Sequence, residues 1–121
     1  MKAKIRVTLM TEEGERFYGP GVQELLTGIS ENGSVKEACT AMGLSYSKGR
    51  RILKHAETAL GYKLVERQQG GIHGGRAFLT PEAEDFMQRY ESLADSISAY
   101  AALRLREIWE ASAPDTDRNK S

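Results

Sequence analysis

The chain has 121 residues, of which 40% are apolar, and its 17 basic and 17 acidic side chains give a formal charge of zero. This length suffices for one small domain with a single core and an arm that packs on another copy. No stretch approaches the roughly 18 to 20 uninterrupted apolar residues of a membrane span, and residues 1–10 lack the apolar block of a signal peptide. The single cysteine, Cys39, excludes an internal disulfide, so the cytoplasm is the expected compartment.

The neutral total hides a division of charge along the chain. Residues 34–76 contain eight basic and three acidic side chains, a balance of +5. Residues 80–117 contain three basic and nine acidic side chains, a balance of −6. A basic middle beside an acidic end favours a surface suited to an anionic polymer such as nucleic acid, and chance clustering of charges is the alternative.

The N-terminal part predicts a hairpin followed by a helix. Residues 4–9 alternate polar and apolar side chains, which is typical of a half-buried strand. After the turn sequence TEEGE, residues 16–18 are expected to pair back as a short second strand. Pro20 suits a first helical turn, apolar residues recur at helical spacing to Ile29, and Asn32-Gly33 predicts the end of this helix.

The middle of the chain predicts two helices joined by a tight turn. Residues 34–37 read SVKE and fit a capping box, which begins a helix of about two turns. Gly43 permits a left-handed backbone, and Ser45 is a good N-cap for the next helix. That second helix is expected to run to about Leu60 and to stop at Gly61.

The glycine-rich sequence RQQGGIHGGRAFLT, residues 67–80, follows a predicted strand at 64–67 and precedes another at 77–79. A phosphate-binding P-loop would have to open directly into a helix, whereas this loop opens into a strand. The stretch is therefore interpreted as the turn of a hairpin. Thr80 and Pro81 are suited to the N-cap and first turn of a helix that continues to residue 111, and residues 112–121 are polar and expected to fray.

These elements predict a mainly α fold with small β-hairpins, namely a winged helix-turn-helix with a long C-terminal dimerisation helix. The expected organisation is a DNA-binding domain with an N-terminal hairpin at 1–79, the long helix at 80–111, and a disordered tail at 112–121. The long helix projects beyond so small a domain, and its apolar stripe should be covered by a second copy. The predicted dimer interface is Phe86, Tyr90, Leu93, Ile97, Tyr100, Leu105, Ile108 and Trp109.

The second helix of the pair carries hydrogen-bond donors suited to phosphate oxygens and base edges. Arg51 and Lys54 are the leading candidates for groove contacts, and Lys48 and Arg50 are assigned to phosphates. Alternatives remain open for Arg50, which could pack its stem on the wing, and for Tyr46, which could belong to the core. Cys39 is expected to be a buried small hydrophobe. The full set of predicted DNA contacts is Ser34, Ser45, Tyr46, Ser47, Lys48, Arg50, Arg51, Lys54, His55, Arg67, His73 and Arg76.

The order and spacing of short motifs over roughly residues 17–88 also indicate a family. The motifs are Gly33-Ser34, Ala38, Gly43-Leu44-Ser45-Tyr46, Leu64-Val65-Glu66-Arg67, Gly70-Gly71, Gly74-Gly75 and Leu79-Thr80. This segment resembles the N-terminal DNA-binding domain of the ModE family of molybdate-responsive regulators and, more distantly, the winged-helix domain of LysR-type regulators. The resemblance implies a winged helix-turn-helix, binding to double-stranded DNA, and a homodimer held largely by the long helix.

One feature of the ModE family is not expected here. Full-length members carry C-terminal molybdate-binding domains, and a small β-barrel cannot be built from the ten residues 112–121. Molybdate binding is therefore not expected in this chain, which leaves another input, a sensing domain on a second chain, or a truncated chain as the alternatives.

The predicted function is that of a sequence-specific, homodimeric DNA-binding transcriptional regulator. The alternative is a winged-helix module that docks an acidic protein partner. An enzyme is not expected, because the sequence shows no paired nucleophile and base and no nucleotide motif in context. No metal site and no cofactor are predicted, since one cysteine and two histidines occur without metal-ligand spacing.

Overall fold

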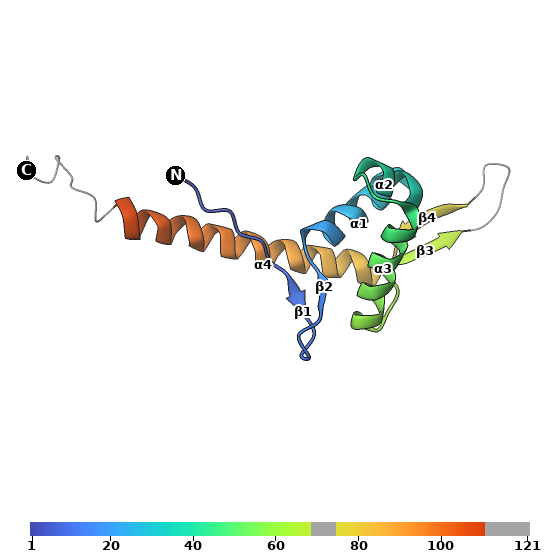
Figure 1. Cartoon of the computed structure of the whole chain (residues 1–121), viewed down its shortest axis with the longest axis horizontal. Coiled ribbons are helices and arrows are strands. Elements are labelled where there is room, and N and C mark those ends of the chain that lie inside the picture. Colours follow the sequence, from blue (N-terminus) through green and yellow to red (C-terminus); the bar gives the residue numbers. More distant parts are fainter. Residues whose placement is uncertain (69–74, 111–121) are drawn as a thin grey trace, which may run out of the picture. The chain divides into compact units, whose positions relative to one another are not determined.

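The computed structural model describes residues 1–68 and 75–110. The elements in chain order are β1 (Leu9–Met10), β2 (Arg16–Tyr18), α1 (Pro20–Asn32), α2 (Val35–Ala41), α3 (Tyr46–Leu60), β3 (Val65–Gln68), β4 (Arg76–Leu79) and α4 (Pro81–Leu105) (Figure 1). Strands β1 and β2 form one antiparallel pair and β3 and β4 form another. The predicted class, mainly helical with small hairpins around a helix-turn-helix, is confirmed.

The N-terminal hairpin is shorter than predicted. Strand β1 covers Leu9–Met10 only, and the ladder shifts register between these residues as it pairs with β2. The expected strand at 4–9 was wrong in extent, because the strand that pairs with it, β2, has only three residues and so offers few backbone partners. Strand β2 ends at Tyr18, since Gly19 and Pro20 begin α1 and proline has no N–H for a ladder.

The three helices α1, α2 and α3 begin and end where their capping residues predict. Helix α1 stops at Gly33, which has a left-handed backbone with φ of 69°. The Ser34 hydroxyl accepts a hydrogen bond from the Glu37 N–H at 3.1 Å, and the Ser45 hydroxyl accepts one from the Lys48 N–H at 3.1 Å. Each serine thereby begins its helix by satisfying a backbone donor that has no partner within the helix.

The core lies where α1, α2, α3 and the wing strand β4 meet. Its largest fully buried side chains are Tyr18, Leu25, Leu26, Ile29, Leu64 and Cys39. The Tyr18 ring packs edge-on against Phe86 of α4, with ring centroids 4.6 Å apart. The Gln23 side chain accepts a hydrogen bond from the Tyr18 hydroxyl and donates one to the carbonyl of Met87 at 3.2 Å. The first turns of α4 therefore pack with the helix-turn-helix, and residues 7–89 form one unit.

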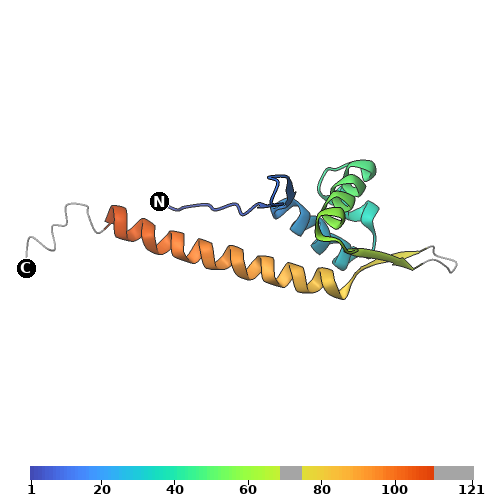
Figure 2. The same cartoon turned by 90° about the horizontal axis from the view of Figure 1, so that it is seen from below.

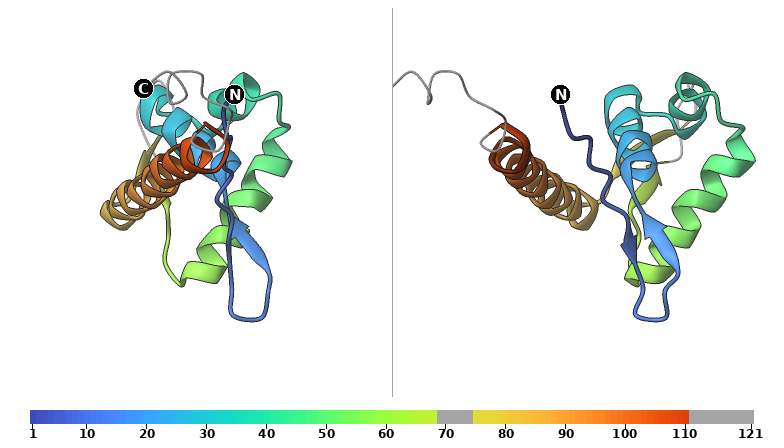
Figure 3. Two further views of the ribbon diagram at one scale, coloured as in Figure 1. Left: turned by 90° about the vertical axis from the view of Figure 1, so that its left-hand side faces the viewer. Right: turned by 60° about the vertical axis from the view of Figure 1, so that its left-hand side comes forward.

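The β3–β4 hairpin is the predicted wing. Its two strands pair along their whole described length, and a backbone hydrogen bond joins β4 to the helix-turn-helix. Val65 lies opposite Leu79, and Gln68 lies opposite Arg76. The Ala77 N–H donates to the Gly33 carbonyl at 3.0 Å, which joins β4 to the turn between α1 and α2. Figure 3 shows this arrangement of the helix-turn-helix, together with the β1–β2 hairpin beside α3.

Thr80 links the wing to α4 in the way its N-cap position predicts. Its hydroxyl accepts from the Ala83 N–H at 3.0 Å and donates to the Lys63 carbonyl at 2.7 Å. Helix α4 then continues uninterrupted to Leu105 (Figure 2) and is followed by a π-helical turn, Arg106–Glu110. The part of α4 from Tyr90 onward groups with residues 1–6 in a second unit. None of the described helices is long and apolar enough to cross a membrane.

Candidate nucleic-acid interface

The side chains that were predicted to contact DNA from α3 are mostly exposed. Ser47, Lys48, Arg50, Arg51 and Lys54 all lie in solvent on this helix. None of the basic side chains in this set forms a salt bridge within residues 1–68 and 75–110. Leu53 and Ala56 are buried on the inner face of α3. The hydrogen-bond donors named above lie outside this buried face and are exposed to solvent.

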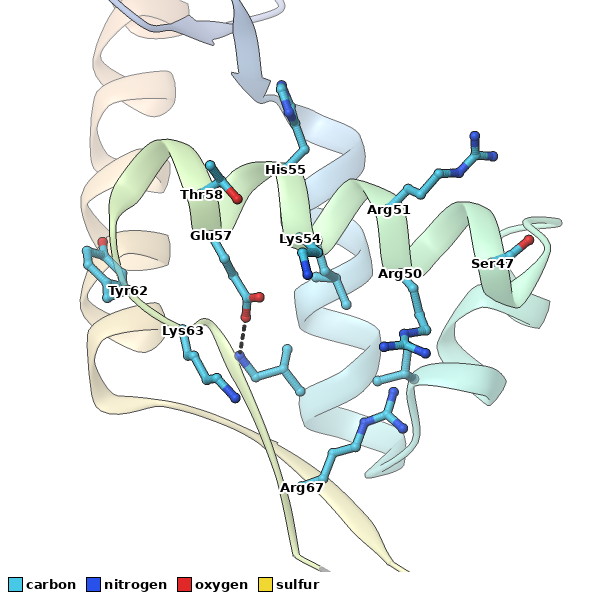
Figure 4. Close-up of a pocket in the computed structure, with 13 residues that line it drawn as sticks. Ser47, Arg50, Arg51, Lys54, His55, Glu57, Thr58, Tyr62, Lys63 and Arg67 are labelled. Carbon is cyan, nitrogen blue, oxygen red and sulfur yellow. Dashed lines mark hydrogen bonds between the residues drawn. The ribbon is translucent and has the colours of Figure 1, made fainter.

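A groove of about 1130 Å³ runs between α3 and the wing strand β3. Its arginine and lysine side chains are Arg50, Arg51, Lys54, Lys63 and Arg67, of which Figure 4 shows Arg67 and Lys63 on the β3 side and the others on α3. We call this the α3–β3 groove and define it by its lysine and arginine side chains, Arg50, Arg51, Lys54, Lys63 and Arg67.

Tyr46 joins α3 to the wing in this structure, and its predicted contact with DNA stays untested. Its ring is half-buried, and its hydroxyl accepts a 2.6 Å hydrogen bond from the Arg67 guanidinium. The guanidinium groups of Arg50 and Arg67 lie over the same ring, at 5.8 and 5.7 Å from its centroid. Tyr46 therefore links the first turn of α3 to the wing, and the Arg50 guanidinium lies over the same ring.

His55 is held by the N-terminal hairpin. Its Nε2 lies 2.9 Å from the carbonyl oxygen of Arg16, and since a carbonyl only accepts, this nitrogen must carry the proton. A carboxylate oxygen of Glu15 lies 3.5 Å from the same nitrogen. The prediction that His55 contacts DNA stays untested, but in this structure its Nε2–H is already used by β2 and the adjoining turn.

The predicted contacts on the wing have different surroundings. Arg67 is exposed and is held by Tyr46 at the base of the hairpin. Arg76 is exposed, and its guanidinium lies so close to Gly33 that a Cβ there would stand 2.7 Å from Nη2. These residues border a cleft of about 720 Å³ together with Ser34 and Lys36. His73 lies outside the described residues.

The sequence comparisons place the chain in a family. The sequence pattern of the family described as "bacterial regulatory helix-turn-helix protein, lysR family" matches residues 24–84, which is half of the chain. The chain belongs to this lysR family of regulatory proteins. The match runs from α1 through the wing into the first turn of α4, so it covers the whole α3–β3 groove.

Individual relatives agree with the resemblance to ModE regulators. The transcriptional regulator ModE of Yersinia pestis is 34% identical over 94 residues, which are 78% of this chain and 35% of that protein. The dual regulator ModE of Escherichia coli K12 is 32% identical over 78% of this chain and 36% of its own length. The chain thus spans about a third of the length of these curated relatives.

A solved DNA complex contains a chain with the same fold. The structure of the BenM DNA-binding domain with benA site 1 DNA superposes with a TM-score of 0.53 at 20% identity, over 78% of this chain and 97% of that chain. The same domain with catB site 1 DNA gives the same values. At this identity the likeness establishes the fold, and the winged helix-turn-helix prediction is confirmed.

Lys63 and Glu57 are groove residues of this lysR-family chain that the sequence reasoning missed. Lys63 lines the groove at the entrance to β3. Oε2 of Glu57 accepts hydrogen bonds from the backbone N–H groups of Leu64 at 2.8 Å and Val65 at 3.3 Å. Lys63 could have been found from its place between a helix-ending glycine and the first strand of the predicted wing. No local sequence pattern predicts the hydrogen bonds of Glu57, because its partners lie seven and eight positions further along the chain.

The predicted dimer residues differ in how far the single chain covers them. Phe86 packs on Tyr18, and Tyr90 is buried, so both are covered within the chain instead of forming an open seam. Burial also raises the pKa of the Tyr90 hydroxyl. Leu105 is half-buried. The predicted residues that stay exposed are Leu93, Ile97, Tyr100, Ile108 and Trp109, and exposed Leu103 joins them.

Cys39 occupies the core position that its apolar stripe predicts. Its side chain is buried in α2, and burial raises the pKa of the thiol above its ordinary value. A raised thiol pKa disfavours the thiolate that redox chemistry and metal binding require. Cys39 is accordingly a packing residue.

Proposed function

We propose that this chain is a sequence-specific DNA-binding transcriptional regulator that acts as a homodimer. The observation that carries the proposal is the set of exposed basic side chains on α3, Lys48, Arg50, Arg51 and Lys54, within a lysR-family helix-turn-helix. None of these four forms a salt bridge with another described residue. An α-helix of this kind fits the major groove of B-form DNA. Phosphate contacts from the basic side chains would supply affinity, and contacts to base edges would supply sequence choice.

The homodimer is proposed from the exposed apolar side chains on α4. Leu93, Ile97, Tyr100 and Leu103 recur at spacings of three and four residues and are exposed in the single chain. A second copy is a partner that would cover them. Two-fold symmetry then leads to a palindromic operator whose half-sites lie about one helical turn, or a multiple of it, apart. Such a regulator would work in the cytoplasm.

The test is a gel-shift titration of the purified chain against fragments of the source genome at low and high salt. We expect binding that weakens steeply as salt rises, since counterions are released from DNA when phosphates are neutralised. Replacing both Arg51 and Lys54 by alanine should remove the preference for the bound fragments. Arg89→Ala is a matched control, because Arg89 is 80% exposed on α4 and pairs only with Asp85 among the described ion pairs.

Two outcomes would contradict the proposal. One is the absence of any DNA binding at low salt, which would favour the alternative of an acidic protein partner. The other is a double variant that selects the same fragments with the same affinity as the original chain.

A further inference from the structure

Two guanidinium groups approach each other from different elements. Arg50 belongs to α3 and Arg67 belongs to β3, and Figure 4 shows their charged ends turned toward one another. Like charges that approach each other repel, so this arrangement requires a compensating group. Within residues 1–68 and 75–110, neither arginine forms a salt bridge with a carboxylate. The compensation therefore comes from a side chain without a formal charge.

That side chain is Tyr46, the first residue of α3. The guanidinium carbons of Arg50 and Arg67 lie over its ring, at 5.8 and 5.7 Å from the ring centroid. The face of an aromatic ring is electron-rich and attracts cations. The Tyr46 hydroxyl also accepts a 2.6 Å hydrogen bond from the Arg67 guanidinium. One tyrosine side chain thus holds both arginines.

This contact restricts side chains that would otherwise move freely. Arg50 and Arg67 are exposed, and a long exposed arginine samples many rotamers. Tyr46 is half-buried and follows the Ser45 cap directly, so its own position is set by the start of α3. Because Arg67 lies within β3, the same contact also ties the wing to the first turn of α3. The free chain therefore already has its wing aligned with this helix.

We propose that Tyr46 is a positioning residue, which aligns the wing with α3 through Arg67 and does not itself contact DNA. The inference rests on the proposed DNA binding and deepens it, and it replaces the direct DNA contact predicted for Tyr46 by an indirect role. A wing that is aligned in advance loses less conformational freedom when DNA binds. Removing the alignment should therefore weaken binding although no contact with DNA is removed.

The test is a double-mutant cycle on DNA affinity, measured by fluorescence anisotropy at low salt with a genomic duplex that the original chain selects. Tyr46→Phe keeps the ring and removes the hydroxyl, and Arg67→Met removes the guanidinium but keeps an unbranched stem. Tyr46→Phe alone should weaken binding about three- to tenfold, the effect of losing one hydrogen bond. In the Arg67→Met background the same substitution should change affinity by less than about twofold, because the group through which it acts is absent.

Two further variants set the scale of the effect. Tyr46→Leu also removes the ring, so it should weaken binding more than Tyr46→Phe does. Tyr62→Phe is the matched control, since Tyr62 is another half-buried tyrosine and its charged neighbours are Asp85, Glu82 and Arg89 of α4. Its affinity for the duplex should equal that of the original chain.

The possible failures are distinguishable. An original chain that does not bind DNA at low salt contradicts the proposed function as a whole. A chain that binds DNA equally well with tyrosine or phenylalanine at position 46 contradicts only the positioning role. Equal losses from Tyr46→Phe in both backgrounds would also overturn that role, since the hydroxyl would then contact DNA itself. So would a loss of affinity that matches the unfolded fraction measured by thermal melting, since Tyr46 would then serve folding alone.

Discussion

At the scale of single residues, the contact between Gly49 and Cys39 sets how closely α2 and α3 approach. Gly49 is buried on the inner face of α3, and a Cβ at this position would collide with Sγ of Cys39. Glycine within a helix costs about 1 kcal/mol relative to alanine. Glycine at position 49 therefore allows α2 and α3 to approach closely, although it lowers the helix propensity of α3.

We predict that Gly49→Ala lowers the free energy of unfolding by about 1–2 kcal/mol, because overpacking of about 1–3 kcal/mol outweighs the gain in helix propensity. Adding Cys39→Ala should restore part of the loss, since the new Cβ would then stand 3.7 Å from Cβ of residue 39, an ordinary contact. Urea titrations of both single variants and the double variant measure this coupling.

Gly21→Ala is the control for this cycle, because a Cβ at Gly21 in α1 meets nothing within 4 Å. That substitution should leave stability unchanged or raise it slightly. A Gly49→Ala variant as stable as Gly21→Ala would show that α2 and α3 can separate without cost.

At the scale of elements, the wing is attached to α3 through the side chain of Glu57. Its carboxylate accepts from the N–H groups of Leu64 and Val65, where the chain leaves α3 and enters β3. Burying a backbone N–H without a partner costs about 1–3 kcal/mol. This link therefore fixes the start of the wing beside the outer face of α3.

We predict that Glu57→Ala lowers the free energy of unfolding by about 1–3 kcal/mol, because it leaves the Leu64 and Val65 N–H groups without their acceptor. Glu57→Gln should lose less, since its amide oxygen can still accept. Chemical denaturation measures both effects, with Glu66→Ala as the control on an exposed position of β3. Equal stabilities of the Glu57 and Glu66 alanine variants would mean that the link contributes nothing.

At the scale of the whole molecule, the exposed apolar side chains of α4 and of the π-helical turn after it decide whether the chain acts alone. Tyr100 is 64% exposed and Trp109 is 53% exposed. Large aromatic side chains dominate the energetics of interfaces because they bury so much area. We therefore predict a dimer at micromolar concentration, measured by light scattering after gel filtration.

Ile97→Glu should convert this dimer to a monomer, since it places a charge among the exposed apolar residues without disturbing the core. Ser98→Glu is the matched control: one residue further along a helix turns the side chain by about 100° onto a different face. The proposed dimer would be wrong if the original chain is a monomer, and the proposed seam would be wrong if both variants behave alike.

The sequence by itself determined where the helices begin and end, and it located the wing. Ser34, Ser45 and Thr80 cap their helices by hydrogen bonds to residues three positions ahead, and Gly33 and Gly61 end theirs with a left-handed backbone. Such signals can be read locally because each partner lies within one helical turn. The exposure of Arg51 and Lys54 also follows from the helical period.

Only the tertiary structure decided which distant residues meet. Tyr46 holds Arg67 across 21 positions, and His55 meets the carbonyl of Arg16 across 39. Polar side chains on an exposed helix face have many possible partners, and the packing of the wing and the N-terminal hairpin selects among them. That selection brings Lys63 and Arg67 to the same groove as the basic residues of α3, because only the folded chain places the start of the wing beside this helix.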